Sequence, residues 1–418
     1  MNRAPQLGTF LSACLVVSSA SAEGWRGGLD LTVETRWFQQ DADLRTEDGS
    51  IDVAVQADLK YTRERWRGIA RAVARADALN TLDTENTQFT VQEAYVGYAG
   101  RFQLDIGYQI MDWTANDVFQ PGDVINSRNL DSNIDSVEKI GEPMVSVAIR
   151  IANGGVSGHY MPFRVPPLYP ARDSRLTPVP GVELGDPLWL GSDGRLDQDR
   201  RDGQWAVRFT QSFRGLDVGV HALRHSDRHQ PLIVADPDTG TPRPLLYSVT
   251  QVGGSFVYVR GALVVRGELA YRFFAVPSLD EPGLAPHDDN IQGAMGAEYG
   301  WAHQAGHETI LVIEAQSLLG ASREERARLM TFQRDAVIAV RHNWNDQQRQ
   351  QMILSAIFDL EREGEFLGSI TYQRRVGESW SLDASARFVY APPKGDPPLG
   401  LETQHANNEI QLNVTRHF

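Results

Sequence analysis

The chain has 418 residues, of which 22% are charged, and its 54 acidic and 40 basic side chains give a formal net charge of −14. This acidic balance argues against a nucleic-acid partner, because phosphates demand a basic face. The single cysteine, Cys14, excludes a disulfide framework.

The N-terminus has the pattern of a secretory signal peptide. After a short basic start, residues 7–17 form an apolar run, and the small residues Ala-Ser-Ala that end at Ala22 suit signal peptidase. We expect a signal peptide over 1–22 and a mature chain over 23–418. The run Leu-Ser-Ala-Cys, ending at Cys14, also fits a lipobox, so lipidation remains an alternative. No stretch of the sequence reaches the roughly 20 apolar residues of a membrane-spanning helix.

Apolar and polar residues alternate with period two along most of the chain, as in 51–61, 263–273 and 379–390. Soluble sandwich strands average about 5–6 residues, whereas these segments run for about 10–13, the length that a tilted strand needs to cross a membrane. The pattern predicts strands near 25–38, 50–61, 66–77, 89–98, 102–112, 144–152, 156–163, 204–212, 216–225, 247–259, 262–274, 290–301, 308–318, 332–344, 351–360, 365–374, 380–390 and 408–418.

The connections between these segments alternate in length. Tight links such as Asn153-Gly154-Gly155 follow the even-numbered strands, and longer stretches rich in Pro, Asp and Gly follow most odd-numbered ones. Short periplasmic turns and long extracellular loops are the pattern of bacterial outer-membrane barrels. The predicted fold is therefore all-β: a transmembrane antiparallel β-barrel of about 18 strands (16–18), multi-pass in the bacterial outer membrane, with outer-membrane lipid and lipopolysaccharide around it.

The C-terminal segment ends on an aromatic residue, Phe418, after alternating apolar residues from Ile410 onward. It resembles the terminal strand that the barrel assembly machinery recognises, which makes that machinery an expected partner. Arg416 interrupts the apolar series, and we expect its long side chain to snorkel toward the water interface. Aromatic residues near the predicted strand ends are typical of membrane girdles.

The polar phase of the strands is expected to face the lumen, and it carries both signs of charge. A lumen selective for a polyanion would be lined mainly by Lys and Arg. We therefore favour charges that pair with each other and stiffen the wall over a row of charges that binds a substrate. The lumen-lining candidates are Arg67, Arg71, Arg75, Asp105, Arg208, Arg266, Glu268, Arg272, Glu298, Glu314, Arg341, Asp383 and Arg387.

Two connections are long enough to have a task of their own. Residues 113–143 are expected to fold inward and narrow the pore, with constriction candidates Trp113, Asp117, Asp123, Asn126 and Arg128. We expect the charged side chains of this loop to pair with charges of the wall and so hold the loop in place. Direct contact of these side chains with a substrate is the less favoured alternative. The proline-rich stretch 165–202 is a candidate for a stiff external lid.

The motif W-x3-D-x3-P-x-D-V-x-N-x-R, which runs from Trp113 to Arg128, resembles a large group of uncharacterised proteobacterial outer-membrane barrels. Thr114 departs from the glycine usual there. The resemblance implies a link to resistance-nodulation-division exporters, and hence an inner-membrane exporter as a partner. The expected architecture is also similar to that of alginate-export-type barrels with 18 strands, although the basic lumen of that type is not evident.

Sequence motifs for catalysis or cofactors are missing: no phosphate loop, zinc spacing or nucleophile elbow occurs. The acidic runs 131–135 and 193–202 do not follow EF-hand spacing. We expect no cofactor and no dedicated metal site, with loosely bound calcium in external loops as the alternative.

The predicted function is a porin-like or export channel that passes a small or elongated solute and is gated by the inward loop. A plugged barrel, serving as a structural or accessory component of a lipid or hydrophobic-compound export system, is the alternative. An outer-membrane enzyme is disfavoured, because no serine–histidine or aspartate–histidine set can be placed.

Overall fold

The computed structural model describes residues 24–39, 46–78, 87–132, 134, 137–177, 179–197, 201–228, 232–236, 239–279, 284–304, 306–395 and 398–418. The expected signal peptide over 1–22, with Cys14, lies outside these residues. Within the described ranges, no helix is both long enough and apolar enough to cross a membrane.

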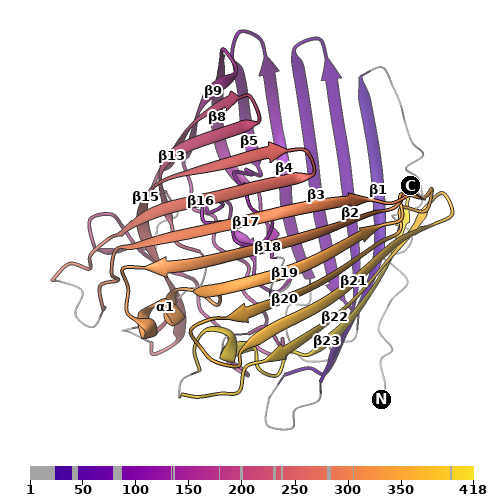
Figure 1. The fold of residues 1–418 in the computed structure, drawn as a ribbon. Helices are drawn as coiled ribbons and strands as arrows, with labels where there is room; N and C mark the ends of the chain where they lie inside the picture. Colours follow the sequence, from indigo (N-terminus) through magenta and orange to yellow (C-terminus); the bar gives the residue numbers. More distant parts are fainter. Residues whose placement is uncertain are drawn as a thin grey trace, which may run out of the picture.

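Eighteen long antiparallel strands form a closed barrel (Figure 1). The barrel closes because the first long strand pairs with both the second and the last. Its strands are β1 (Trp25–Phe38), β2 (Gly49–Arg63), β3 (Trp66–Asp77), β4 (Thr87–Ala99), β5 (Gln103–Gln109), β8 (Glu142–Ile151), β9 (Gly154–Met161), β12 (Gln204–Phe213), β13 (Leu216–Ser226), β15 (Pro242–Arg260), β16 (Leu263–Phe274), β17 (Asn290–Ala302), β18 (Glu308–Leu319), β19 (Arg334–Asn343), β20 (Gln351–Asp359), β21 (Phe366–Val376), β22 (Trp380–Tyr390) and β23 (Glu409–His417).

Each predicted strand corresponds to one of these, so the predicted barrel and its count of eighteen are confirmed. Two strands differ most from their predicted bounds. β5 ends at Gln109 instead of near 112, because the chain there leaves the wall and enters the lumen. β15 begins at Pro242 instead of near 247, because its first residues pair with short strands outside the barrel wall.

The long connections contain smaller elements that the alternation did not predict. They are β6 (Arg128–Asn129), β7 (Glu138–Lys139), β10 (Leu188–Leu190), β11 (Leu196–Asp197), β14 (Leu232–Ala235), the helix α1 (Arg323–Leu329) and the 3-10 helix η1 (Gly400–Gln404). α1 begins where the Ser322 side chain accepts a hydrogen bond from the backbone N–H of Glu325, which caps the free donors of the first turn.

Short turns and long connections lie at opposite ends of the barrel, as predicted. The turn between β12 and β13 has only two residues, Arg214 and Gly215, and Gly215 has a φ of 75°, which an L side chain rarely adopts. The helix α1 and the connections around it lie at the other end (Figure 1). Short turns mark the periplasmic end and long loops the extracellular end.

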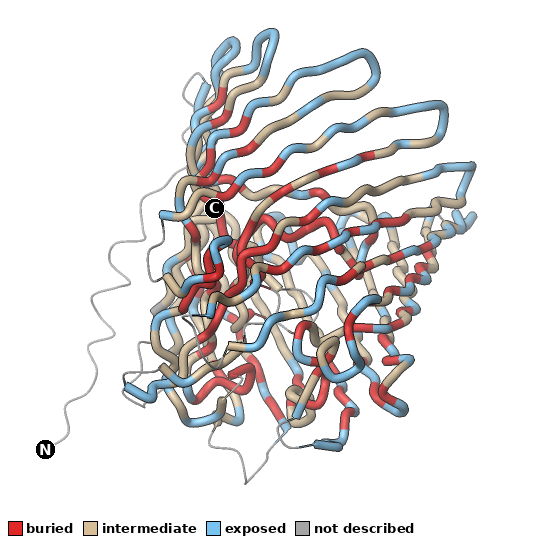
Figure 2. Tube along the Cα trace, turned by 90° about the vertical axis from the view of Figure 1, so that its left-hand side faces the viewer, coloured by how far each residue is buried: buried red, intermediate tan, exposed pale blue. Residues whose placement is uncertain are grey.

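The outer wall of the barrel is apolar and exposed, as the alternation predicted. In strands such as β8, β17 and β18, buried residues alternate with more exposed ones, and Figure 2 shows this change of burial along the trace. Large apolar side chains on the outward phase remain uncovered, such as Val220, Ile370 and Ile410, and aromatic side chains such as Trp66 and Trp380 stand exposed at the periplasmic end. An uncovered apolar belt of this extent is stable only against lipid. With the barrel fold, it identifies a multi-pass outer-membrane protein.

Candidate functional site

The segment 110–141, between β5 and β8, lies inside the barrel and is closed at its neck by one asparagine. The Asn126 side chain donates hydrogen bonds to the backbone oxygens of Gln109 and Ile140, at 2.9 Å each. Its own oxygen accepts the backbone N–H of Met111 at 2.7 Å. One side chain therefore ties both ends of the loop together where the loop leaves the wall.

The base of the loop is anchored by Trp113, whose side chain is only 4% exposed. The rings of His159 and His221 lie 5.7 and 5.6 Å from its ring, and the Arg208 guanidinium lies 5.4 Å from the ring centroid, in cation–π geometry. An apolar cluster inside the lumen continues this contact: Trp113, Val124, Ile125, Met144, Met161, Ala206 and Leu223. On this side of the lumen the loop therefore packs directly against β8, β9, β12 and β13.

Two carboxylates of the opposite wall bind the backbone of the loop tip, and the first belongs to Glu268 of β16. One of its oxygens accepts the N–H groups of Ala115 (2.5 Å) and Asn116 (3.0 Å), and the other accepts that of Gly122 (2.9 Å). A Cβ at Gly122 would lie 3.2 Å from the latter oxygen. A glycine there lets the backbone approach the carboxylate this closely.

The second carboxylate belongs to Glu314 of β18. It accepts the N–H groups of Asp117, Val118 and Phe119 at 2.6, 3.0 and 3.1 Å. Bonds from N–H groups to an ionised, buried oxygen are stronger than neutral ones. Six backbone donors of the tip are thus satisfied by two wall side chains.

Ion pairs connect the loop to the wall and to itself. Asp117 pairs with Arg266 of β16 at 2.6 Å, and Arg266 also binds Glu298 of β17 at 2.7 Å. Asp123 pairs instead with two residues of its own loop, Arg128 at 2.6 Å and Lys139 at 2.8 Å; its other contacts are also within the loop. Among the candidates, Asp117 therefore links the loop to the wall, whereas Asp123 and Arg128 stiffen the loop internally.

Sequence reasoning did not identify a further pair that holds the loop, Glu142 and Arg228. The fully buried Glu142 at the start of β8 accepts the N–H of Ser127 at 3.1 Å and lies 3.2 Å from Arg228. Arg228, from the connection after β13, donates to the backbone oxygen of Ile125 at 2.9 Å. No local pattern reveals such a pair, since its members are far apart in sequence and one lies in a loop.

Most of the remaining candidate charges are paired along the lumen face. The pairs are Arg67 with Asp105 (2.7 Å), Arg71 with Asp58 (2.5 Å) and Glu93 (3.4 Å), Arg75 with Glu34 (2.8 Å) and Glu138 (3.3 Å), Arg272 with Asp227 (2.8 Å), and Arg387 with Glu409 (2.6 Å). Among the described residues, Arg208, Arg341 and Asp383 are the exceptions: none of them makes an ion pair, and the Nε of Arg208 and that of Arg341 are each buried without a partner.

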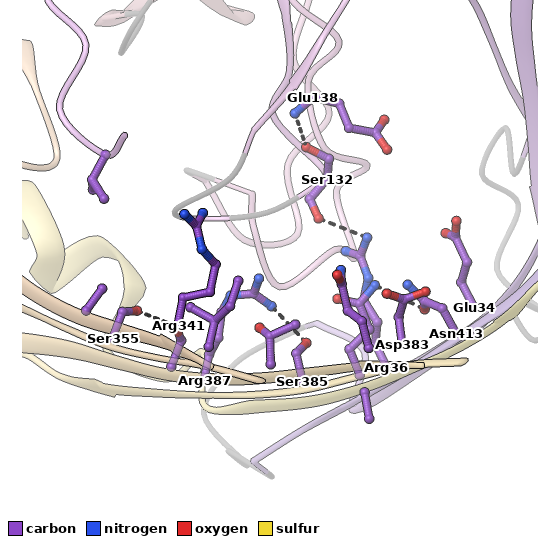
Figure 3. A pocket seen from close by; sticks show the side chains of 18 of the residues that line it. Glu34, Arg36, Ser132, Glu138, Arg341, Ser355, Asp383, Ser385, Arg387 and Asn413 are labelled. Atoms are coloured by element: carbon purple, nitrogen blue, oxygen red, sulfur yellow. Dashed lines mark hydrogen bonds between the residues drawn. The ribbon is translucent and has the colours of Figure 1, made fainter. Parts of the chain in front are cut away.

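Beside the loop tip, a cavity of about 640 Å³ remains open in the lumen. In Figure 3, Arg341 rises from the wall into this space, while Asp383 and Asn413 line it farther round. The strand register aligns its floor into a row across six strands: Arg341, Ile353, Thr371, Ser385, Gln411 and Arg36. The neighbouring Ser355 and Ser369 hydroxyls lie 2.6 Å apart. The wall of the cavity is thus mostly polar, with as many charged as neutral polar side chains.

A second cavity of about 430 Å³ lies toward the extracellular side and is lined by Gln292, Gln316 and residues of the loop. Asp117 and Val118 line both cavities. These two residues, which we call the partition, therefore lie between the two cavities.

The proline-rich connection after β9 contacts the inward loop and the first external connection. Leu168 and Arg128 are joined by a backbone hydrogen bond of 3.0 Å, and Arg175 donates to the backbone oxygen of Glu47 at 2.8 Å. Within the described ranges, no group of three or more His, Cys, Asp or Glu side chains is arranged to hold a metal ion.

No protein-family model and no curated protein matches the sequence. Among solved structures, the chain is similar to OccAB1 of Acinetobacter baumannii, with a TM-score of 0.55 and 10% identity over 96% of this chain and 99% of that one. It is also similar to OccAB2 of the same organism (0.50; 12% identity; 94% and 98%) and to OccK11 (OpdR) of Pseudomonas aeruginosa (0.50; 10% identity; 94% and 96%). The likeness is one of fold: the chain has the barrel of outer-membrane porins.

Proposed function

We propose that the protein is an outer-membrane channel for small polar solutes, constricted by the loop 110–141. The observation that carries the proposal is the binding of six backbone N–H groups of the loop tip by Glu268 and Glu314, beside a polar cavity. A loop that only filled space would not need buried carboxylates aimed at its main chain. The arrangement instead holds the tip at a fixed distance from the opposite wall.

The lining of the cavity supports a small hydrophilic solute. Hydroxyl and amide groups such as those of Ser385, Thr371 and Gln411 exchange hydrogen bonds with a passing solute, as water does. Charged groups of both signs are mostly neutralised by each other, so the field along the path is weak for a polyanion. Selectivity would then depend on size and on the unpaired Arg341.

The gating step that we propose is a local displacement of the partition at Asp117 and Val118. These residues lie between the two cavities. They are held to the wall by the Glu314 hydrogen bonds, by the Arg266 ion pair and by packing of Val118 against the apolar cluster of the far wall. Moving this short segment would join the cavities while the base around Trp113 stayed packed.

A plugged accessory barrel is the second candidate, and one observation favours it. Phe119 at the loop tip is 4% exposed and packs in an apolar cluster with Val337, Ile357 and Leu367 of the far wall. The loop therefore reaches from one side of the lumen to the other. A barrel whose function was structural would have the same feature.

Conductance in planar bilayers separates the two candidates. We expect the purified wild-type barrel to form small, ion-conducting pores, and deletion of residues 116–129 to enlarge both the conductance and the size limit for neutral sugars in liposome swelling. A deletion variant that folds but leaves both properties unchanged would contradict the proposed constriction. A barrel that conducts neither before nor after the deletion would favour the plugged accessory component.

A further inference from the structure

Two arginines lie on the outer, lipid-facing phase of the wall near its periplasmic edge. On β23, Arg416 lies on the same outward face as Ile410, which is 58% exposed. On β21, Arg374 lies on the same outward face as Ile370. The alternate positions on these strands line the lumen cavity instead. Arg416 pairs in register with Trp380, which is 43% exposed on the same outer face.

Neither arginine has a counterion in the part of the chain that the structure describes. The Nε of Arg374 is buried and has no hydrogen-bond partner. Arg416 donates to the Ser379 hydroxyl at 2.5 Å, and its guanidinium stacks at 5.1 Å from the Trp380 ring and 5.5 Å from the Phe418 ring. An unpaired cation on the lipid face is unfavourable unless it reaches the interface or meets an anion there.

The two side chains are close enough to serve one ligand. β22 alone separates their strands, and Arg374 is offset by two residues from the row that contains Arg416, so their backbones are about 12 Å apart. Arg374 lies two residues before the end of β21, and Arg416 lies one residue before the end of β23. Both therefore lie at the depth of the lipid headgroups, with Trp380 on the strand between them, as interfacial aromatic residues do.

We propose that Arg374, Arg416 and Trp380 form a binding site for the phosphate of a phospholipid in the periplasmic leaflet. A guanidinium offers a planar fork of donors that matches phosphate oxygens. The stacking of Arg416 on Trp380 and Phe418 fixes the plane of that fork, and the guanidinium of Arg374 supplies a second positive charge. Leu382, which pairs with Arg374, and Val414 continue the same face toward the membrane centre and would contact the acyl chains.

The choice of a lipid over a soluble anion rests on where these groups point. The site opens on the outer wall, between apolar side chains, and a hydrated anion would have to enter the edge of the bilayer to reach it. The proposal is independent of transport, because the lumen-facing residues of the same strands take no part in it.

Native mass spectrometry of the full-length barrel in detergent tests the proposal with three probes: phosphatidylglycerol, diacylglycerol with the same acyl chains, and inorganic phosphate. We expect wild-type protein to retain phosphatidylglycerol and neither of the other two. The double variant R374Q/R416Q should bind phosphatidylglycerol on the order of 25-fold more weakly, since each interfacial arginine contributes about fivefold. Heat-modifiable electrophoretic mobility would establish that each variant is a folded barrel.

The matched control is R349Q, which removes an exposed arginine from a turn at the same end of the barrel. It should leave phosphatidylglycerol binding unchanged. An equal loss in R349Q would show attraction by general positive charge and overturn the site. Equal retention of diacylglycerol would show recognition of the acyl chains alone, and binding of inorganic phosphate at the same strength would show a soluble-anion site; both would also overturn it.

Discussion

Replacing Glu314 by glutamine is the most direct test of how the loop is held. The substitution keeps the size of the side chain but exchanges one carboxylate oxygen for an NH2 group. In the wild type, one oxygen accepts the N–H of Asp117 and the other accepts those of Val118 and Phe119. In the variant, at least one of these N–H groups faces another donor, and the remaining bonds lose the benefit of the negative charge.

The expected cost follows from these three bonds. A hydrogen bond to a charged group contributes about 1.5–3 kcal/mol, and a buried donor left without a partner is penalised further. Losing one bond and weakening two gives about 3 kcal/mol in favour of the released tip. Since about 1.4 kcal/mol corresponds to a tenfold change in an equilibrium constant, the population of the released tip should rise by about two orders of magnitude.

Single-channel recording in planar bilayers measures this change. We expect Glu314→Gln to show larger conductance and more open-channel noise than wild type, and the double variant with Glu268→Gln to show more of both. Glu308→Gln is the matched control, because Glu308 lies on the same strand and the same face but has no hydrogen bond or ion pair with the described residues of the loop. If the folded Glu314→Gln channel is indistinguishable from the Glu308→Gln control, the two wall carboxylates do not hold the constriction.

Three further changes test other parts of the site. Arg341→Gln should lower the permeability ratio of anions over cations by about twofold, which is the effect of one charge at high dielectric several ångströms away. Reversal potentials measure this ratio. An equal change in Arg71→Gln, whose arginine is already paired, would contradict a special role for Arg341. Burial and neighbouring carboxylates, Asp77 first, raise the pKa of Glu47 to about 8. The folded external connection therefore binds this proton more tightly than the unfolded one, so its stability falls as pH rises from about 4.5 to about 8. The hydrogen-exchange protection factor of the Glu47 backbone N–H, corrected for the intrinsic exchange rate at each pH, should fall over that window and stay constant in Glu47→Gln. A wild-type protection factor that does not change with pH would refute the shift. Trp113→Ala should destabilise the loop by about 3–5 kcal/mol, seen as proteolysis within 110–141, whereas an uncleaved variant would show that the base does not depend on this ring.

The strand pattern was predictable from the sequence because alternation is local: each residue's face depends on its parity along the strand. Most interactions across the lumen were not predictable, because they join residues more than 100 positions apart. Examples are the hydrogen bonds from the N–H of Ala115 to Glu268 and from the N–H of Asp117 to Glu314. Both glutamates were recognisable as lumen-facing, but their partners are backbone groups, which leave no mark on composition. The inward loop was expected from its length. Asp117 forms an ion pair with the wall, as predicted, whereas the ion pairs of Asp123 are with residues of its own loop.

The tip of the inward loop is bound by Glu268 and Glu314 through its main chain, whose N–H group every amino acid except proline supplies in the same form. This main-chain part of the anchor tolerates changes in the tip sequence as long as the wall glutamates stay in place, whereas Asp117 and Phe119 add side-chain contacts of their own. This separates the scaffold from the surface that a solute meets. Such a channel is a suitable starting point for redesign, in which the tip sequence is randomised on a constant frame and pores of new selectivity are chosen from the library.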